Sequence, residues 1–170
     1  MEPKPTFDAR FSAPEASPLP WEDVQGLLGA AELYWLTTVR ADGRPHVTPL
    51  VGVQVGGAMH FVTGLSEQKA RNLEHSPRVA LTTGTNTWAR GTDVVVEGTA
   101  VRVTDDDALR EVKRAYDVKY AGDWTFEVGD GVFHHGEARD GAVFRIEPSK
   151  VMAFAKDPHG QTTFRFPPQA

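Results

Sequence analysis

One short segment combines residue types that could bind an anion. The run TGLSEQKARNL, residues 63–73, reads as the end of a strand followed by the start of a helix. Ser66 is a good N-cap, which would put Lys69 at the third helical position, where glutamate or glutamine would complete a capping box. A cation there opposes the helix macrodipole by roughly half a kcal/mol. A bound phosphate would reverse that sign, because amides, hydroxyl and ammonium would converge on one anion; a solvated surface lysine explains the pattern equally well.

No other pattern points to a catalytic side chain. The chain has no cysteine, which excludes disulfides, thiolate catalysis and thiolate metal sites, and it contains neither GxSxG nor HExxH. His134 and His135 are adjacent, so their side chains would diverge, and no third ligand has a recognisable spacing. We therefore expect no metal site. His46 and His60 are expected on strands, where a proton-donor role is the alternative to a plain surface or groove position.

The elements that would position these residues are mostly strands. Apolar alternation and turn signals predict about seven of them, over residues 33–40, 46–55, 58–64, 77–84, 93–104, 142–155 and 162–166. Asp42-Gly43 is a hairpin signal between the first two. Gly98, inside the fifth, suggests a bulge or a close backbone approach. Pro49 inside the second suggests a bulge or an edge strand.

Three helices and a loop complete the expected order. One helix begins after Pro20 with Trp21, Val24, Leu27 and Leu28 on one face, one begins near Ser66, and one spans 105–120. The last has Thr104 or Asp105 as its cap and buries Leu109, Val112 and Tyr116. Residues 121–141 are expected to be a loop with one short element. Hairpin-linked strands predict an antiparallel sheet, and about seven strands suggest a closed or nearly closed barrel.

Composition sets the class of protein. The 170 residues suit one domain, and five prolines within residues 1–20 indicate an extended N-terminal arm ahead of a domain over 21–170. The formal charge of −5 argues against nucleic-acid or anionic-membrane binding. The N-terminus lacks an apolar h-region, and no apolar run reaches the ~18 residues that a membrane span needs. We expect a cytoplasmic protein without nucleic-acid or membrane partners.

A longer pattern adds a family resemblance. The run LTTVRADGRPHVTPLVGV, followed by MHFVTGLSEQKARNLEHSPRVALTT, resembles the pyridoxamine 5′-phosphate oxidase-like superfamily over roughly residues 30 to 155. The resemblance implies a mainly β protein with a few helices, the FMN-binding split β-barrel, and a homodimer whose two cofactors lie in grooves between subunits. It assigns the cofactor phosphate to Ser66 and Lys69. It assigns the flavin ring and ribityl chain to two strand segments, Thr48, Pro49, Leu50 and Val51, and Val62, Thr63 and Gly64.

Three positions depart from the true pyridoxamine 5′-phosphate oxidases. Those enzymes carry arginine at the positions of Thr48 and Gln68, and lysine at the position of Val53. Vitamin B6 oxidation is therefore not expected. The chain is more similar to the flavin/deazaflavin oxidoreductase branch, many of whose members use the deazaflavin coenzyme F420. In that branch an aromatic residue at the position of Trp88 lies near the cofactor, and Gln68 is also counted among the expected cofactor residues.

The resemblance implies hydride transfer between F420, or FMN, and a small conjugated substrate. The cofactor would supply that chemistry, so no catalytic side chain is needed. Two alternatives remain open at the level of sequence. One is an FMN-dependent oxidase or reductase of the same fold, and the other is a non-enzymatic protein that binds haem or a flavin.

Overall fold

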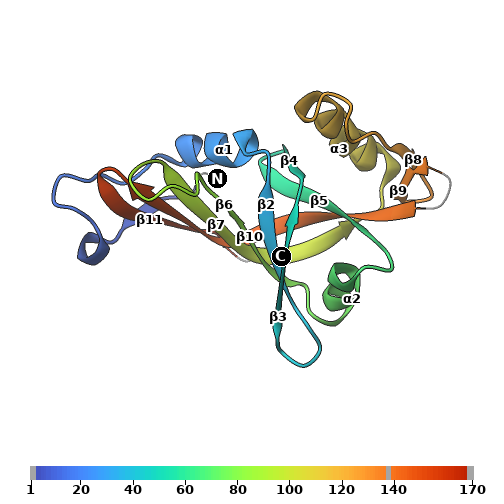
Figure 1. The fold of residues 1–170 in the computed structure, drawn as a ribbon, viewed down its shortest axis with the longest axis horizontal. Helices are drawn as coiled ribbons and strands as arrows, with labels where there is room; N and C mark the ends of the chain where they lie inside the picture. Colours follow the sequence, from blue (N-terminus) through green and yellow to red (C-terminus); the bar gives the residue numbers. More distant parts are fainter. Residues whose placement is uncertain (1–2, 137–138, 168–170) are drawn as a thin grey trace.

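The computed structural model describes residues 3–136 and 139–167, which form one antiparallel sheet with helices on its surface (Figure 1). The helices are η1 (Ala9–Phe11, a 3-10 turn), α1 (Trp21–Ala30), α2 (Gln68–His75) and α3 (Asp106–Lys119). The strands are β1 (Pro5–Phe7), β2 (Tyr34–Val39), β3 (Pro45–Leu50), β4 (Gly52–Val55), β5 (Ala58–Gly64), β6 (Arg78–Thr83), β7 (Thr92–Val103), β8 (Glu127–Gly129), β9 (Val132–His135), β10 (Arg139–Lys156) and β11 (His159–Arg165).

The sheet has the predicted antiparallel pairing but is not closed. Its main path runs β1-β11-β10-β7-β6-β2-β3, and β10 also pairs with β5 and β9. No ladder within the described residues joins β3 to β4 or β5, so the two ends of the barrel stay apart. The expected split β-barrel is confirmed, whereas the closed form of it is not found.

The 18-residue strand β10 is the centre of the sheet. One edge of β10 pairs with β7. Its other edge pairs first with β9 and β5 and then with β11. The register against β7 shifts between Pro148 and Lys150, where Gly98 faces the strand. A Cβ on Gly98 would lie 2.2 Å from the Glu147 carbonyl oxygen, so the predicted close backbone approach at this glycine is confirmed.

The strand predicted over 46–55 is in fact two strands. β3 pairs with β2, and β4 pairs with β5, so the chain changes partners at Val51. Alternation alone did not reveal the break, because both halves are apolar on alternate residues. Pro49 lies on β3, which ends the main path of the sheet. An edge position tolerates proline because the missing N–H is not needed by a neighbouring strand.

The helices cover two hydrophobic clusters. Asp105 caps α3 by accepting the Ala108 amide at 2.9 Å, and the three predicted apolar residues of α3 are buried. Trp21 of α1 packs against Phe164 and Phe166, but Leu27, predicted on the buried face, is 38% exposed. No helix in the described residues is long and apolar enough to cross a membrane.

Two segments contain more structure than the sequence indicated. The predicted loop at 121–141 holds the β8–β9 hairpin and the first residues of β10. Part of the N-terminal arm joins the sheet, since β1 pairs with β11. The β2–β3 hairpin extends away from the body of the sheet, and α2 lies beside it (Figure 1).

The contact at Gly98 yields a stability prediction. Gly98→Ala should lower the free energy of unfolding by about 1–3 kcal/mol, because a methyl group cannot fit against the Glu147 backbone. Gly26 of α1 is a matched control, since its Cβ would meet no neighbouring atom within 4 Å. Gly26→Ala should stabilise the protein by roughly 0.5–1 kcal/mol through helix propensity. Urea unfolding followed by circular dichroism measures both; a Gly98→Ala protein as stable as wild type would contradict the contact.

Candidate functional site

The expected cofactor residues lie on four neighbouring pieces of the chain. Residues 48–50 are on β3, Val51 is at the break before β4, and residues 62–64 end β5. Ser66 is in the turn that follows, and Gln68 and Lys69 open α2. Val51 and Val62 pack against the same buried cluster under α3. The structure therefore brings these segments together, apart from Trp88.

The start of α2 differs from the prediction. The helix begins at Gln68 with Glu67 as N-cap, so Ser66 stands one residue outside the cap and Lys69 occupies the second helical position. Glu67 accepts the Gly64 amide at 3.0 Å and forms an ion pair with Lys69. Burial alone would raise the pKa of Glu67, but the hydrogen bonds from Lys69 and Gly64 hold it below its usual value.

The cation at the helix start is therefore neither unpaired nor freely solvated. The Lys69 side chain is only 12% exposed, whereas that of Glu67 is 49% exposed. The Lys69 ammonium carries three N–H donors and has one half-exposed carboxylate as its ion-pair partner. It can therefore still donate to a second anion. The sequence could not show this arrangement, because a Glu-x-Lys spacing also occurs on ordinary solvated surfaces.

A chain of polar side chains fastens α2 to the sheet. Gln68 donates to the Asn72 side-chain oxygen at 2.8 Å, and Asn72 donates to the Thr38 hydroxyl at 2.8 Å. Asn72 is 2% exposed and Thr38 is fully buried. Buried hydrogen bonds of this kind hold the orientation of a helix because breaking one leaves a buried polar group unpaired. Gln68 thus contributes to the site by positioning the helix start.

One buried hydroxyl group on β3 and another on β5 lack partners. The side-chain oxygens of Thr48 and Thr63 are shielded from solvent and have no hydrogen-bond partner within the described residues. Leaving a buried hydroxyl unpaired costs about 1–3 kcal/mol. Both threonines belong to the segments assigned to the flavin, so the polar groups here fit a ligand that carries hydroxyl and carbonyl groups.

The backbone at the β3–β4 break is held by α3. Tyr116 donates its hydroxyl to the Val51 carbonyl at 3.2 Å. The Tyr120 hydroxyl bonds both the amide and the carbonyl of Gly52, and Lys119 donates to the same carbonyl at 2.9 Å. Sequence reasoning missed these three residues as site supports; the signal available was two tyrosines and a lysine at one end of an amphipathic helix.

Lys119 is an unusual lysine. It donates to the Tyr34 hydroxyl at 2.8 Å and lies over the rings of Tyr34 and Tyr120. Burial lowers its pKa to about 8, against a smaller opposing effect of the Glu32 carboxylate. Burial also raises the pKa values of Tyr34 and Tyr120.

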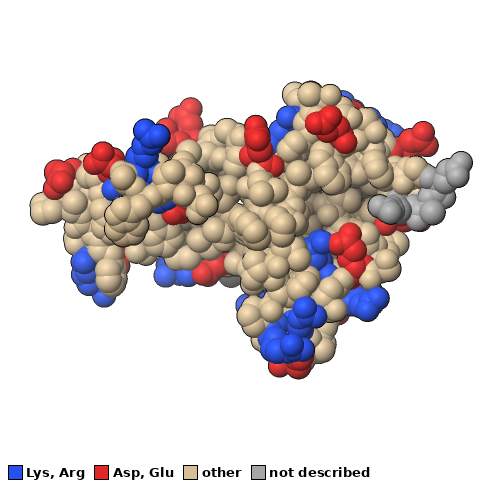
Figure 2. All heavy atoms as spheres, viewed as in Figure 1, with Lys and Arg blue, Asp and Glu red and all other residues tan. Residues whose placement is uncertain are grey.

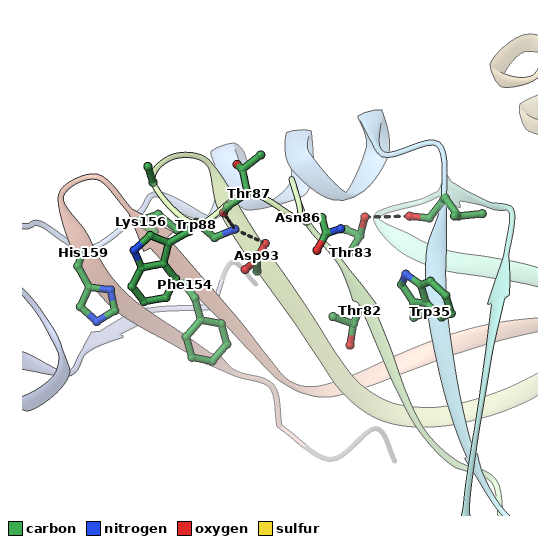
Figure 3. Close-up of a pocket in the computed structure, with 14 residues that line it drawn as sticks. Trp35, Thr82, Thr83, Asn86, Thr87, Trp88, Asp93, Phe154, Lys156 and His159 are labelled. Carbon is green, nitrogen blue, oxygen red and sulfur yellow. Dashed lines mark hydrogen bonds and ion pairs between the residues drawn. The ribbon is translucent and has the colours of Figure 1, made fainter.

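Trp88 lies in a different place from the other expected residues. Its side chain is 94% exposed, and it lines a cavity of about 1230 Å³ together with Trp35 and Phe154 (Figure 3). Lys156 holds the loop that carries Trp88 by donating to the Thr87 carbonyl at 2.5 Å, and it also pairs with the Asp93 carboxylate of β7 at 2.9 Å. None of the other expected cofactor residues lines this cavity. Within this single chain, Trp88 therefore lies apart from the expected cofactor residues at the start of α2.

The outer face of the β2–β3 hairpin carries exposed apolar side chains. Trp35 is 50% exposed and sits opposite Pro49, and Val47, which is 53% exposed, sits opposite Thr37. Residues directly opposite in an antiparallel pair share a face. These side chains form one patch, and contiguous apolar patches mark interaction surfaces more often than single exposed residues do.

The remaining histidines show no metal site. His60 is 6% exposed, and burial lowers its pKa, so it is neutral at pH 7. His134 pairs with Asp140 at 2.7 Å, and the hydrogen bond to this carboxylate raises the pKa of His134. No group of three metal-ligating side chains occurs in the described part of the chain.

Comparison with known proteins identifies the fold. A family model described as Pyridoxamine 5′-phosphate oxidase matches residues 20–154. A conserved hypothetical protein from Mycobacterium tuberculosis is 21% identical, with a TM-score of 0.69 over 85% of this chain and 89% of that one. Among curated proteins, no sequence matches the chain.

Two further solved structures are of proteins that are named for the ligands they bind. A heme binding protein from Mycobacterium smegmatis is 18% identical, with a TM-score of 0.66 over 88% of this chain and 59% of that one. An FAD binding protein from Mycobacterium smegmatis is 19% identical, with a TM-score of 0.55 over 88% of this chain and 98% of that one. At these identities the likeness shows a shared fold.

The lysine under α3 yields a prediction of pH-dependent stability. Between pH 8 and about pH 10 the unfolded chain retains a proton on Lys119 that the folded protein releases. The free energy of unfolding should therefore rise with pH in this window. Above it the buried tyrosines should reverse the trend, because they hold their protons longer when folded. Urea unfolding across this pH range measures the effect, and Lys119→Met should remove the rise; an unchanged rise in this variant would assign it to other groups.

Proposed function

The chain belongs to the pyridoxamine 5′-phosphate oxidase family, and from this premise we propose that it is an oxidoreductase that binds a flavin or deazaflavin between β3, β5 and the start of α2. Two observations carry the proposal: the hydroxyls of Thr48 and Thr63 are buried and without partners among the described residues, and the Lys69 ammonium is paired with the half-exposed carboxylate of Glu67. A cofactor with a polar ring, a hydroxylated chain and a phosphate satisfies all three groups.

Each part of the site has a distinct task. Lys69 and Ser66 hold the phosphate, and the end of β5, residues 62–64, faces the ring and the ribityl chain. The backbone from Thr48 to Val51 borders the ring, and α3 keeps that backbone in place through Val51 and Gly52. The bound cofactor supplies hydride transfer, while the protein binds it, orients it and excludes water.

Oxidation of a B6 phosphate ester is not the proposed reaction. Val53, at the position where true pyridoxamine 5′-phosphate oxidases carry lysine, is 1% exposed and packs with Leu109 and Val112 beneath α3. This position faces the core and offers no contact to a substrate phosphate. We favour F420 or FMN as cofactor and a small conjugated molecule as substrate, since Val53 supplies no charge for a substrate phosphate.

Haem binding without turnover is a second candidate. The cavity around Trp88 is lined by Trp35, Phe154 and His159, which together offer aromatic walls and an imidazole (Figure 3). A solved structure of similar fold is a heme binding protein. A Soret band that develops on haem addition, and that is lost in His159→Ala, would favour this candidate over the first.

The proposed assembly is a homodimer. The patch of Trp35, Val47 and Pro49 lies on an open sheet face, and an identical patch on a second copy could cover it. Such a partner would also approach the cavity that Trp88 lines, because Trp35 belongs to both surfaces. An aromatic loop from one subunit could then complete the cofactor groove of the other.

The cofactor proposal is tested at Lys69. Lys69→Ala should weaken binding of FMN or F420 about 10- to 150-fold, because a charge-assisted hydrogen bond contributes roughly 1.5–3 kcal/mol. Glu67→Gln is the matched control: it removes the competing charge yet keeps an oxygen for the Gly64 amide, so binding should strengthen. Fluorescence titration of each cofactor against each protein measures both effects. Wild-type affinity in Lys69→Ala would place the phosphate elsewhere.

The dimer proposal is tested by mass. Light scattering at micromolar concentration should give twice the chain mass of 18.6 kDa for the wild type. Trp35→Glu should dissociate the dimer, because burying an unpaired carboxylate in an apolar interface is strongly unfavourable. Val118→Glu, at an 84% exposed apolar site on α3, should leave the mass unchanged. A monomeric wild type would refute the assembly.

A further inference from the structure

The expected phosphate site has too little positive charge if Lys69 acts alone. A phosphate monoester carries about −1.5 to −2 charges at pH 7, and Lys69 already shares its charge with Glu67. Thr48 provides a hydroxyl where an arginine is expected from the family pattern. The missing charge must come from other groups near the start of α2 if a phosphate is to bind there.

His46 is placed to contribute. It precedes Thr48 by two residues on β3, so the two side chains share a face of the strand, and both are partly buried. Directly across from it, Thr38 of β2 has its hydroxyl 3.5 Å from His46 Nδ1 and 3.4 Å from the His46 carbonyl oxygen. The same hydroxyl accepts from Asn72 and donates its own proton to the His46 carbonyl oxygen.

This hydrogen-bond chain leaves one imidazole nitrogen available. The 3.5 Å contact of Thr38 is to Nδ1, so Nε2 has no hydrogen-bond partner among the described residues, and the tautomer with its proton on Nε2 can donate to an anion. The chain from Gln68 through Asn72 and Thr38 therefore connects the first turn of α2 to His46 on β3.

Arg40 adds a third cation. Arg40 directly follows β2 and is partly buried. It makes no ion pair within the described part of the chain, whereas Arg44 on the same hairpin pairs with Asp42. Arg40 follows Thr38 by two residues and its amide bonds the Arg44 carbonyl, so it continues the hairpin face on which Thr38 sits opposite His46. Burial, and after it the charges of Arg40 and Lys69, lower the pKa of His46. Figure 2 shows basic side chains gathered over the β2–β3 hairpin and α2.

We propose that Arg40, His46 and Lys69 jointly hold the phosphate of the cofactor, and that His46 takes up a proton from water when the phosphate binds. The inference rests on the proposed function and adds two residues and a pH response to it. Without an anion, burial and the two fixed cations lower the pKa of His46 and favour the neutral imidazole at pH 7. A phosphate reverses that balance, since it attracts the imidazolium more strongly than Arg40 and Lys69 repel it. Other charged groups on the hairpin and α2 are the Asp42–Arg44 pair, Glu67, Arg71 and Glu74.

The consequence is a pH-dependent affinity. Because proton uptake accompanies binding, the affinity for a phosphate-bearing cofactor should rise as pH falls from 8 to 6. The flavin ring alone should show no such trend. A neutral substitute for His46 should remove the response, whereas a permanently charged lysine there should give tight binding at both pH values.

The experiment compares binding with and without the phosphate at pH 6 and pH 8. FMN is titrated beside riboflavin, and F420 beside the deazaflavin that lacks the phosphate side chain, into wild type, His46→Gln, Arg40→Gln and Arg44→Gln. His46→Gln should weaken binding of the phosphate-bearing cofactor about tenfold at pH 6 and little at pH 8. Arg40→Gln should weaken it at both pH values, and Arg44→Gln, whose arginine is already paired, should bind as wild type does. Riboflavin and the phosphate-free deazaflavin should bind equally well to all four proteins.

The outcomes separate the two proposals. If the wild type binds none of the four cofactors, the proposed function fails and this inference fails with it. If the wild type binds FMN or F420 but His46→Gln and Arg40→Gln bind equally well at both pH values, this inference alone is overturned. Calorimetry in two buffers of different ionisation enthalpy gives a second readout. Proton uptake should be present in wild type and absent in His46→Gln.

Discussion

The whole structure depends on the need to pair both edges of one long strand. β10 has 18 residues, and its backbone N–H and C=O groups must find partners along both sides. β7 pairs with one edge, and three different strands share the other. The change of partners near Pro148, where Gly98 lets the backbones approach, divides the sheet into two wings. One wing carries α1 and the N-terminal strand, and the other carries α3 and the β8–β9 hairpin.

The candidate site forms where the second wing meets the β2–β3 hairpin. The chain leaves one wing at the end of β3 and joins the other at β4, so the backbone at Val51 belongs to neither ladder. Tyr116, Lys119 and Tyr120 satisfy that backbone from α3. α2 is fastened on the opposite side through Asn72 and Thr38. Buried polar contacts thus fix α3 and α2, and the hydroxyl groups of Thr48 on β3 and Thr63 on β5 lack partners among the described residues.

Charge distribution explains how an acidic protein could still bind an anionic cofactor. The formal charge is −5, yet the groups around the start of α2 are mainly basic, with Glu67 as the local carboxylate. Glu67 neutralises Lys69 in the free protein and orders the turn through the Gly64 amide. Lys69 would otherwise destabilise the helix start. In the proposed complex an anion would share the ammonium with Glu67.

The sequence by itself determined the antiparallel sheet, the positions of most strands, the capped helix α3 and the family, because these follow from local periodicity, turn residues and a contiguous motif. It also located Thr48, Thr63 and Lys69 as residues of interest. Only the tertiary structure decided that α2 starts at Gln68, that β3 and β4 are separate strands, and that Trp88 stands apart from the other expected residues. It also revealed the hydrogen bond of Lys119 to the Gly52 carbonyl and the position of His46 opposite Thr38. These features depend on contacts between residues distant in the chain, such as Asn72 with Thr38 and Lys119 with Gly52, and such contacts leave no periodic signal in the sequence.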